Sequence, residues 1–232
     1  MNPLKLLMPT MIVGIALLAL LIGEEAAWAR TAESAETVNI TKTPVNVKYH
    51  TFDPRRPPSE MPRLKPPEAA LCVANFLSSA SVSGQAASTD ATRAKLTINR
   101  IDVTLQLNIT IWLPPNPPRK IVEHEEGHRQ IAEYFYNSAD LIAKRLAQSY
   151  IGKVIELSGR DVRKALTLAL NKIGEDITEA YKKQMPVERA EVRYDAITDH
   201  GRNDVPVATA VAQSIRETAV ASPQPTAPST RK

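Results

Sequence analysis

Residues 101–128 read IDVTLQLNITIWLPPNPPRKIVEHEEGH and combine a strand, a proline-rich connection and the beginning of a helix. Apolar side chains occupy every second position from Ile101 to Ile111, which predicts a strand with one buried and one exposed face. Four prolines between Pro114 and Pro118 end this strand, because proline cannot donate to a ladder and disfavours helix in the residue before it. The stretch therefore predicts a strand that leads into a helix.

Further strand patterns lie before residue 101. Alternating residues in Thr37–Phe52, interrupted by Pro44, predict one edge strand or two short ones. Arg55–Pro67 is rich in proline and charge, which predicts a loop. A second strand is expected over Ala70–Val82, ending in small residues around Gly84. Leu96 and Ile98 are out of phase with Ile101, so we expect a bulge or a tight turn near Asn99-Arg100.

The chain after residue 118 has helical periodicity. One helix is expected from about Pro118 to Ser149, and a second from about Asp161 to Lys183. Gly152 and the pair Ser158-Gly159 separate them. The fold class predicted from these elements is α+β, with an antiparallel sheet packed against two long helices.

The two ends of the chain differ from its middle in composition. Lys5, the uncharged stretch Leu6–Gly23 and Ala27-Trp28-Ala29 predict a signal peptide over residues 1–29, with an uncleaved membrane anchor as the alternative. Residues 202–232 are rich in Ala, Pro, Ser and Thr, which predicts a largely disordered tail. One domain is therefore expected over residues 30–201, in a protein that is exported to the periplasm or the extracellular space, or anchored to the inner membrane.

Composition excludes several classes of protein. With 43% apolar residues in 232, the chain can bury a core. The net charge of +4 comes from basic residues scattered among acidic ones, and aromatic residues are few, so no nucleic-acid partner is expected. Cys72 is the only cysteine, which excludes an intramolecular disulfide, and its apolar neighbours favour a small buried side chain over a nucleophile.

The segment His124-Glu125-Glu126-Gly127-His128 has the H-E-x-x-H spacing of a zinc site. Histidines four residues apart on a helix lie on one face, where both imidazoles can bind one cation. Glu125 projects about 100° away, where its carboxylate can take a proton from a water on the metal. The histidines share a stripe with Ile121 and Ile131, and two imidazoles facing a core without a ligand would be costly.

Catalytic zinc normally has three protein ligands, so a further ligand is expected. The best candidates lie in the late segment Tyr194-Asp195-Ala196-Ile197-Thr198-Asp199-His200-Gly201. His200 is the first choice and Asp195 the alternative, while Glu133 lies off the face of the two histidines. Capping of a helix end by Asp199 and His200 is the structural alternative. Tyr194 is a candidate donor to a developing oxyanion or, alternatively, a packing residue.

The order of these features resembles a bacterial domain-of-unknown-function family of predicted secreted zinc-dependent proteases. The resemblance covers roughly Thr37–Gly201: a signal peptide, a strand with a cysteine, a strand ending in Leu-Pro, the H-E-x-x-H helix followed by Ile131, and a late Tyr-Asp-x-x-Thr-x-His-Gly motif at residues 194–201. It implies a zincin-like fold, with His124 and His128 as ligands and Glu125 as general base, and it points to the late motif for the remaining ligand.

Three features depart from related zinc peptidases. Glu126 is charged where those enzymes usually have an uncharged residue, Tyr134 stands where the extended astacin-like and matrixin-like signature has a third histidine, and no Asn-Glu pair follows as in thermolysin-like enzymes.

The sequence predicts a secreted zinc metallopeptidase that hydrolyses polypeptides. A zinc amidase acting on cell-wall material is one alternative. A non-enzymatic envelope protein that binds zinc is another, and a closed site with four protein ligands would favour it. The alternating strand that ends at Trp112 is expected to offer an edge to an extended substrate.

Overall fold

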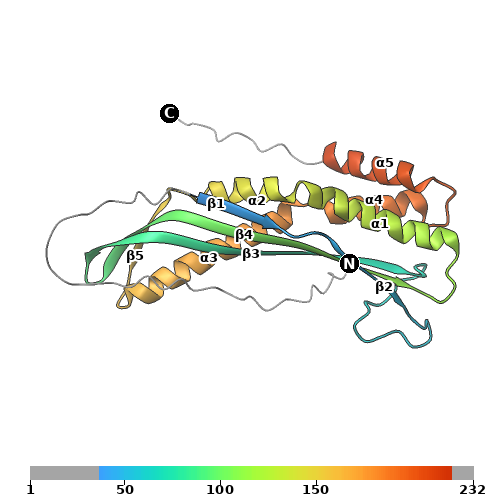
Figure 1. Cartoon of the computed structure of the whole chain (residues 1–232), viewed down its shortest axis with the longest axis horizontal. Helices are drawn as coiled ribbons and strands as arrows, with labels where there is room; N and C mark the ends of the chain where they lie inside the picture. The colour runs from blue at the N-terminus through green and yellow to red at the C-terminus, as the bar shows by residue number, and fades with distance from the viewer. Residues whose placement is uncertain (1–36, 221–232) are drawn as a thin grey trace. The chain divides into compact units, whose positions relative to one another are not determined.

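The protein has the α+β composition that its sequence predicts (Figure 1). A computed structural model describes residues 37–220. The order of elements is β1 (Thr37–Lys42), β2 (Asn46–Thr51), β3 (Leu71–Asp90), β4 (Arg93–Leu113), α1 (Arg119–Asn137), α2 (Ala139–Gln148), β5 (Val154–Ser158), α3 (Val162–Gln184), α4 (Val187–Thr198) and α5 (Val207–Val220).

Strand β4 organises the five-stranded sheet, because each of the other four strands pairs with it. β2 runs parallel to β4, from the pair Asn46↔Asn108 to Thr51↔Leu113, whereas β5 is antiparallel. The sheet is therefore mixed, and the prediction of an antiparallel sheet was wrong. The reason is connectivity: β3 lies between β2 and β4 in the chain, so β2 reaches β4 by a crossover rather than by a hairpin.

The break expected in β3 is absent, whereas β4 shows the phase change expected near Asn99-Arg100. β3 continues through Gly84 to Asp90, because the missing side chain lets β4 approach: a Cβ on Gly84 would lie 2.6 Å from Leu96 Cδ1. β4 continues through Asn99 and Arg100 without a turn, and its buried positions change phase there between Ile98 and Ile101, as the predicted bulge would produce. The small residues of β3 thus marked close packing and not a strand end.

The helix expected from about Pro118 to Ser149 is divided in two. α1 ends at Asn137, and Ser138 departs from helical geometry with φ −100° and ψ 6°. The Ser138 hydroxyl donates to the Phe135 carbonyl, which is how a short polar side chain competes with the helical ladder. α2 then begins at Ala139. The second expected helix is confirmed as α3, whereas β5 had not been predicted.

The described chain packs as two compact units. The first comprises residues 37–41, 79–104 and 144–179, and it contains the pairing of β5 with β4. The second comprises residues 42–78, 105–143 and 180–220, and it contains the pairing of β2 with β4. Both the H-E-x-x-H segment and the late motif lie in the second unit.

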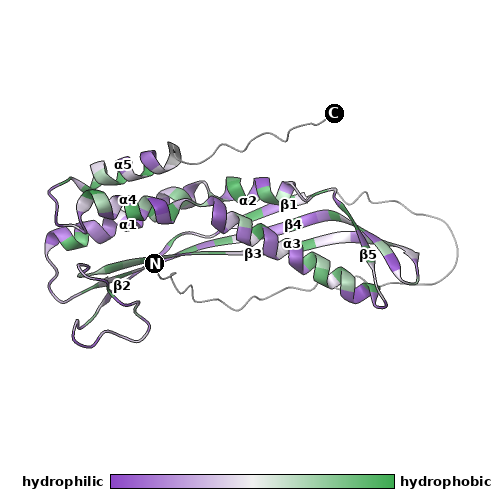
Figure 2. Cartoon of the chain, turned by 180° about the vertical axis from the view of Figure 1, so that it is seen from behind, coloured by the Kyte–Doolittle hydropathy of each residue, from purple (hydrophilic) through white to green (hydrophobic). Residues whose placement is uncertain are grey.

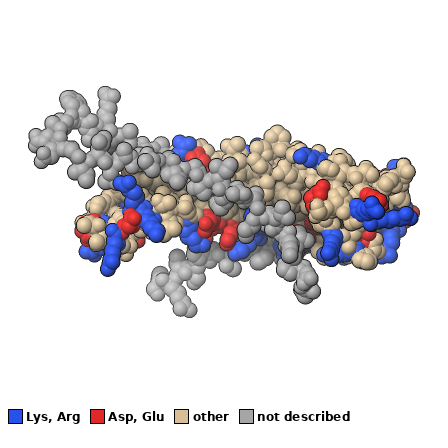
Figure 3. All heavy atoms as spheres, turned by 90° about the horizontal axis from the view of Figure 1, so that it is seen from below, with Lys and Arg blue, Asp and Glu red and all other residues tan. Residues whose placement is uncertain are grey.

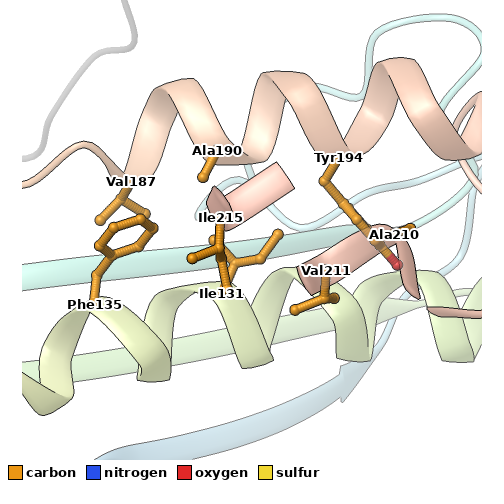
Figure 4. Close-up of a cluster of buried hydrophobic side chains, with 8 residues drawn as sticks. All are labelled: Ile131, Phe135, Val187, Ala190, Tyr194, Ala210, Val211 and Ile215. Atoms are coloured by element: carbon orange, nitrogen blue, oxygen red, sulfur yellow. The ribbon is translucent and has the colours of Figure 1, made fainter. Parts of the chain in front are cut away.

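The core of the second unit is built by α1, α4 and α5, which contact one another pairwise. Figure 4 shows Ile131 and Phe135 of α1 facing Val187, Ala190 and Tyr194 of α4. Hydrophilic and hydrophobic residues are interleaved along these helices, as expected of elements with one buried face (Figure 2). A separate cluster joins Phe52, Met61 and Trp112, so Met61 anchors the proline-rich loop.

The prediction of a disordered tail from residue 202 was wrong for residues 207–220. These form α5, and Ala210, Val211 and Ile215 are buried in the core against α1 and α4. The apolar residues stand at helical spacing, which the bias toward Ala, Ser and Thr obscured. Residues 221–232 and the expected signal peptide lie outside the described residues. Among residues 37–220, no helix has the length and apolar character to cross a bilayer.

Truncation of a core residue in α5 tests its contribution to stability. Ile215→Ala should lower the free energy of unfolding by about 2–5 kcal/mol, because it removes a buried side chain and leaves a cavity. Arg216→Ala, which changes the exposed neighbour, should alter it by less than about 0.5 kcal/mol. Urea unfolding of both variants measures the difference, and equal values would show that α5 adds nothing to the core.

Candidate metal centre

The two histidines of α1 face α4 from adjacent turns. His124 is 5% exposed, and the Nε2 atoms of His124 and His128 are 3.3 Å apart. The prediction that the two imidazoles lie on one face is confirmed. Two ring nitrogens this close must share a proton or a cation, because two lone pairs facing each other repel.

Asp195 lies at the centre of the cluster. Its Oδ1 atom is 3.0 Å from His128 Nε2, 3.3 Å from His124 Nε2 and 3.5 Å from His200 Nδ1. The late segment thus brings both of its predicted ligand candidates to the histidines of α1. His124, Asp195 and His200 form a group that could hold a metal ion.

The turn after α4 returns His200 to the cluster. α4 ends at Thr198, and the next three residues all have positive φ: Asp199 at 49°, His200 at 53° and Gly201 at 79°. The backbone N–H of Asn203 donates to the Thr198 carbonyl at 2.8 Å and closes the turn. Left-handed backbone is unfavourable for His200, so the surrounding contacts must hold it.

His124 is fixed by three residues of the late segment. The ring of Tyr194 stacks on it with a centroid distance of 5.1 Å and an interplanar angle of 11°. Thr198 Oγ1 is 3.2 Å from His124 Nδ1. Gly201 packs so closely that a Cβ there would lie 3.0 Å from His124 Cβ. One helix and one turn therefore determine the orientation of this imidazole.

Tyr194 is a core residue in the structure. It is completely buried, and its side chain points from α4 toward α1 (Figure 4). Its hydroxyl donates to the His124 carbonyl at 3.2 Å. The ring lies against Gly127, where any larger residue would collide with it. This geometry favours the packing alternative over the oxyanion role, because the hydroxyl proton is already bonded to the main chain.

Glu125 lies beside the cluster and is 4% exposed. Burial raises the pKa of Glu125 to about 7. The charge of His128 and a hydrogen bond from the Cys72 backbone lower it, but by less. A carboxyl group with this pKa can accept and return a proton near neutral pH. Burial also raises the pKa of the Cys72 thiol, which agrees with an unreactive cysteine.

Glu191 is a site residue that the sequence analysis missed. It stands one helical turn before Asp195, and burial raises its pKa to about 7, with His128 opposing and Asp195 adding to the rise. The signal was present as Glu191-x-x-x-Asp195, two carboxylates on one face of an amphipathic helix.

The electrostatics of the cluster depend on Asp195. Burial alone would raise the pKa of Asp195, but the imidazoles of His124 and His128 beside its carboxylate outweigh burial and hold that pKa well below its usual range. Burial lowers the pKa of His124. Burial also opposes charge on His128, but the Asp195 carboxylate outweighs it and raises the His128 pKa. The cluster therefore keeps Asp195 ionised and attracts one positive charge.

The other two acidic residues of α1 have different partners. Glu126 accepts a hydrogen bond from Arg129 at 2.5 Å and another from the Tyr49 hydroxyl of β2, also at 2.5 Å. Glu133 pairs with Arg129 at 2.6 Å. The Glu126 carboxylate, at a position that is usually uncharged, thus links β2 to α1 through a hydrogen bond. Glu133 pairs with Arg129 instead and is not part of the cluster.

The donor atoms are of the kinds that a divalent metal ion such as zinc accepts. Tetrahedral coordination with bonds of about 2.0–2.1 Å places ligand atoms about 3.3–3.4 Å apart. The distances among His124 Nε2, His128 Nε2 and Asp195 Oδ1 are 3.3, 3.0 and 3.3 Å. Imidazole and carboxylate are both ligands that zinc accepts.

Comparison with known proteins adds no further assignment: no protein-family model, curated protein sequence or solved structure matches the chain. The family resemblance therefore stays a prediction, and the argument for function rests on the geometry of the site.

Gly127→Ala tests the close contact between α1 and α4. Alanine at an exposed helical position would stabilise by about 1 kcal/mol, but here its Cβ collides with the Tyr194 ring. We expect a net loss of about 1–3 kcal/mol in unfolding free energy, measured in urea. A stabilised variant would show that the ring moves aside freely.

Proposed function

We propose that the protein is an exported zinc-dependent peptidase. The observation that carries the proposal is the convergence of three ligand atoms, 3.0–3.3 Å from one another, beside a buried carboxyl group, Glu125, whose pKa is raised to about 7. Metal hydrolases combine these parts: a cation, an exchangeable position and a proton acceptor. Export is the inference from residues 1–29 and is part of the proposal.

We assign His124, His128 and Asp195 as the zinc ligands. His128 is preferred to His200 because its Nε2 atom lies close to both other ligands, 3.3 Å from His124 Nε2 and 3.0 Å from Asp195 Oδ1, and because it belongs to the H-E-x-x-H pair. This choice replaces His200, the first candidate from the sequence, with Asp195, the second. His200, whose Nδ1 lies 3.5 Å from Asp195 Oδ1, would then stay free of the metal, and hydrolysis would require one exchangeable position on the ion.

The chemistry divides between the metal and the protein. Zinc in such a site lowers the pKa of a water to about 7 and polarises a carbonyl group. Glu125 accepts the proton from the attacking water and returns it to the leaving amine. We assign His200, which lies beside Asp195, as a donor to the oxygen of the scissile carbonyl.

The prediction that the edge of β4 binds the substrate needs correction. β4 pairs with four strands and offers no edge beside the site, because β2 covers it from Asn46 to Thr51. Within residues 37–220, β2 pairs only with β4, so its outer edge can accept an extended peptide. The hydrogen bond from Tyr49 to Glu126 keeps this edge next to α1, which supports a polypeptide as the substrate.

The main alternative is a protein that binds zinc without catalysis. A fourth donor, His200, lies within reach of Asp195, and four protein ligands would close the site. A cell-wall amidase would use the same zinc chemistry, but the open strand edge favours peptides. On the face in Figure 3, acidic and basic side chains are interspersed, and we propose no nucleic-acid partner.

Metal analysis of the purified protein tests the ligand set. Wild type should contain about one zinc per chain after dialysis, and His124→Ala and Asp195→Ala should lose it, because two ligands cannot hold the ion. His200→Ala should retain it. His50→Ala is the matched control, since His50 stacks on Trp112 away from the cluster. Zinc loss in His200→Ala would favour the closed, non-catalytic site. Absence of zinc in the wild-type protein would refute the proposal.

Replacement of Glu125 tests catalysis separately from metal binding. Glu125→Gln should retain zinc but cleave unfolded polypeptide about 10²–10⁴-fold more slowly, because the amide cannot accept the proton. Glu133→Gln, on the same helix, should cleave at the wild-type rate. Equal rates for Glu125→Gln and wild type would refute the peptidase mechanism even if zinc is bound.

A further inference from the structure

The Thr198 side chain lies between α4 and the imidazole of His124. It is 3% exposed and stands one turn beyond Asp195 on α4. Its Oγ1 atom is 2.9 Å from the Tyr194 carbonyl oxygen and 3.2 Å from His124 Nδ1. Both contacts are buried, so no solvent competes for either partner.

These two contacts determine the direction of both hydrogen bonds. A hydroxyl group has one proton, and a carbonyl oxygen can only accept. The contact with Tyr194 therefore requires the Thr198 hydroxyl to donate there, which leaves only its lone pairs for His124. The bond to the imidazole forms only if Nδ1 carries the proton and donates it to Thr198.

This arrangement prepares His124 as a ligand. Neutral imidazole carries one proton, so a protonated Nδ1 leaves the lone pair on Nε2. That atom is the one that faces Asp195 Oδ1 at 3.3 Å and His128 Nε2 at 3.3 Å. With a lone pair on Nε2, His124 cannot donate to the carboxylate, and the two groups attract only through a cation between them.

We infer that Thr198 is a positioning residue for the metal site: its hydroxyl selects the Nδ1-protonated form of His124 and fixes the ring plane, so that Nε2 is ready to bind zinc. The inference rests on the proposed function, because it gives Thr198 a role only toward the metal. Hydrogen bonds to the non-coordinating nitrogen of a histidine orient the ring and raise its basicity as a ligand.

The test compares three variants with wild type by zinc affinity, measured in competition with a chelator. Thr198→Val keeps the shape but removes the acceptor, and should weaken zinc binding by about 10–100-fold. Thr198→Ser restores the hydroxyl and should bind within about threefold of wild type. Thr218→Val is the matched control, because Thr218 donates to the Ser214 carbonyl on α5 with the same geometry at 2.7 Å and is also buried.

A second readout follows the proton itself. In zinc-loaded protein labelled with ¹⁵N-histidine, the His124 Nδ1–H signal should lie downfield in wild type and Thr198→Ser and move upfield in Thr198→Val. If Thr198→Val only lowered the stability of the protein, the Nδ1–H signal would keep its wild-type position. The control Thr218→Val should keep the wild-type zinc affinity.

The possible outcomes separate the two proposals. Weak binding in Thr198→Val, with rescue by Ser and no loss in Thr218→Val, supports the inference. Wild-type affinity in Thr198→Val, failure of Ser to rescue, or an unchanged Nδ1–H signal overturns it while leaving the zinc site intact. Absence of zinc binding in wild type overturns the proposed function itself.

Discussion

The second unit of this protein depends on the contact between one carboxylate oxygen and three imidazoles. Asp195 Oδ1 lies within 3.5 Å of nitrogens from His124, His128 and His200. A buried carboxylate is costly unless it is paired, and closely spaced imidazole lone pairs repel. A cation at the centre would satisfy all of these groups at once and would stabilise the packing of α1 on α4.

Close packing of α1 on α4 makes this cluster possible. Gly127 admits the ring of Tyr194, Gly201 lies against His124, and the Tyr194 hydroxyl satisfies a carbonyl of the metal helix. α5 packs into the same core cluster as α1 and α4 through Val211 and Ile215. The residues around the site therefore act mainly by holding other residues in place, which is how a metal site keeps its ligands near the required geometry.

Local patterns predicted part of this arrangement correctly. The alternation from Ile101 to Ile111, the proline break and the shared face of His124 and His128 all follow from period and backbone chemistry, which act over a few residues. Sequence patterns gave wrong predictions where packing against another strand or helix determines the local structure. Gly84 suggested a strand end but allows β4 to approach, and the sequence around Ala210 suggested disorder but forms a helix because α1 and α4 cover its apolar face.

The sequence alone indicated most of the residues that form the cluster: an H-E-x-x-H helix and a late segment with Asp195 and His200. It left the further ligand open between His200 and Asp195, and it did not indicate Glu191 or the role of Thr198. Only the tertiary structure brought these groups together, because residues about seventy positions apart meet through helix packing and a left-handed turn. Side-chain periodicity contains no information about such distances.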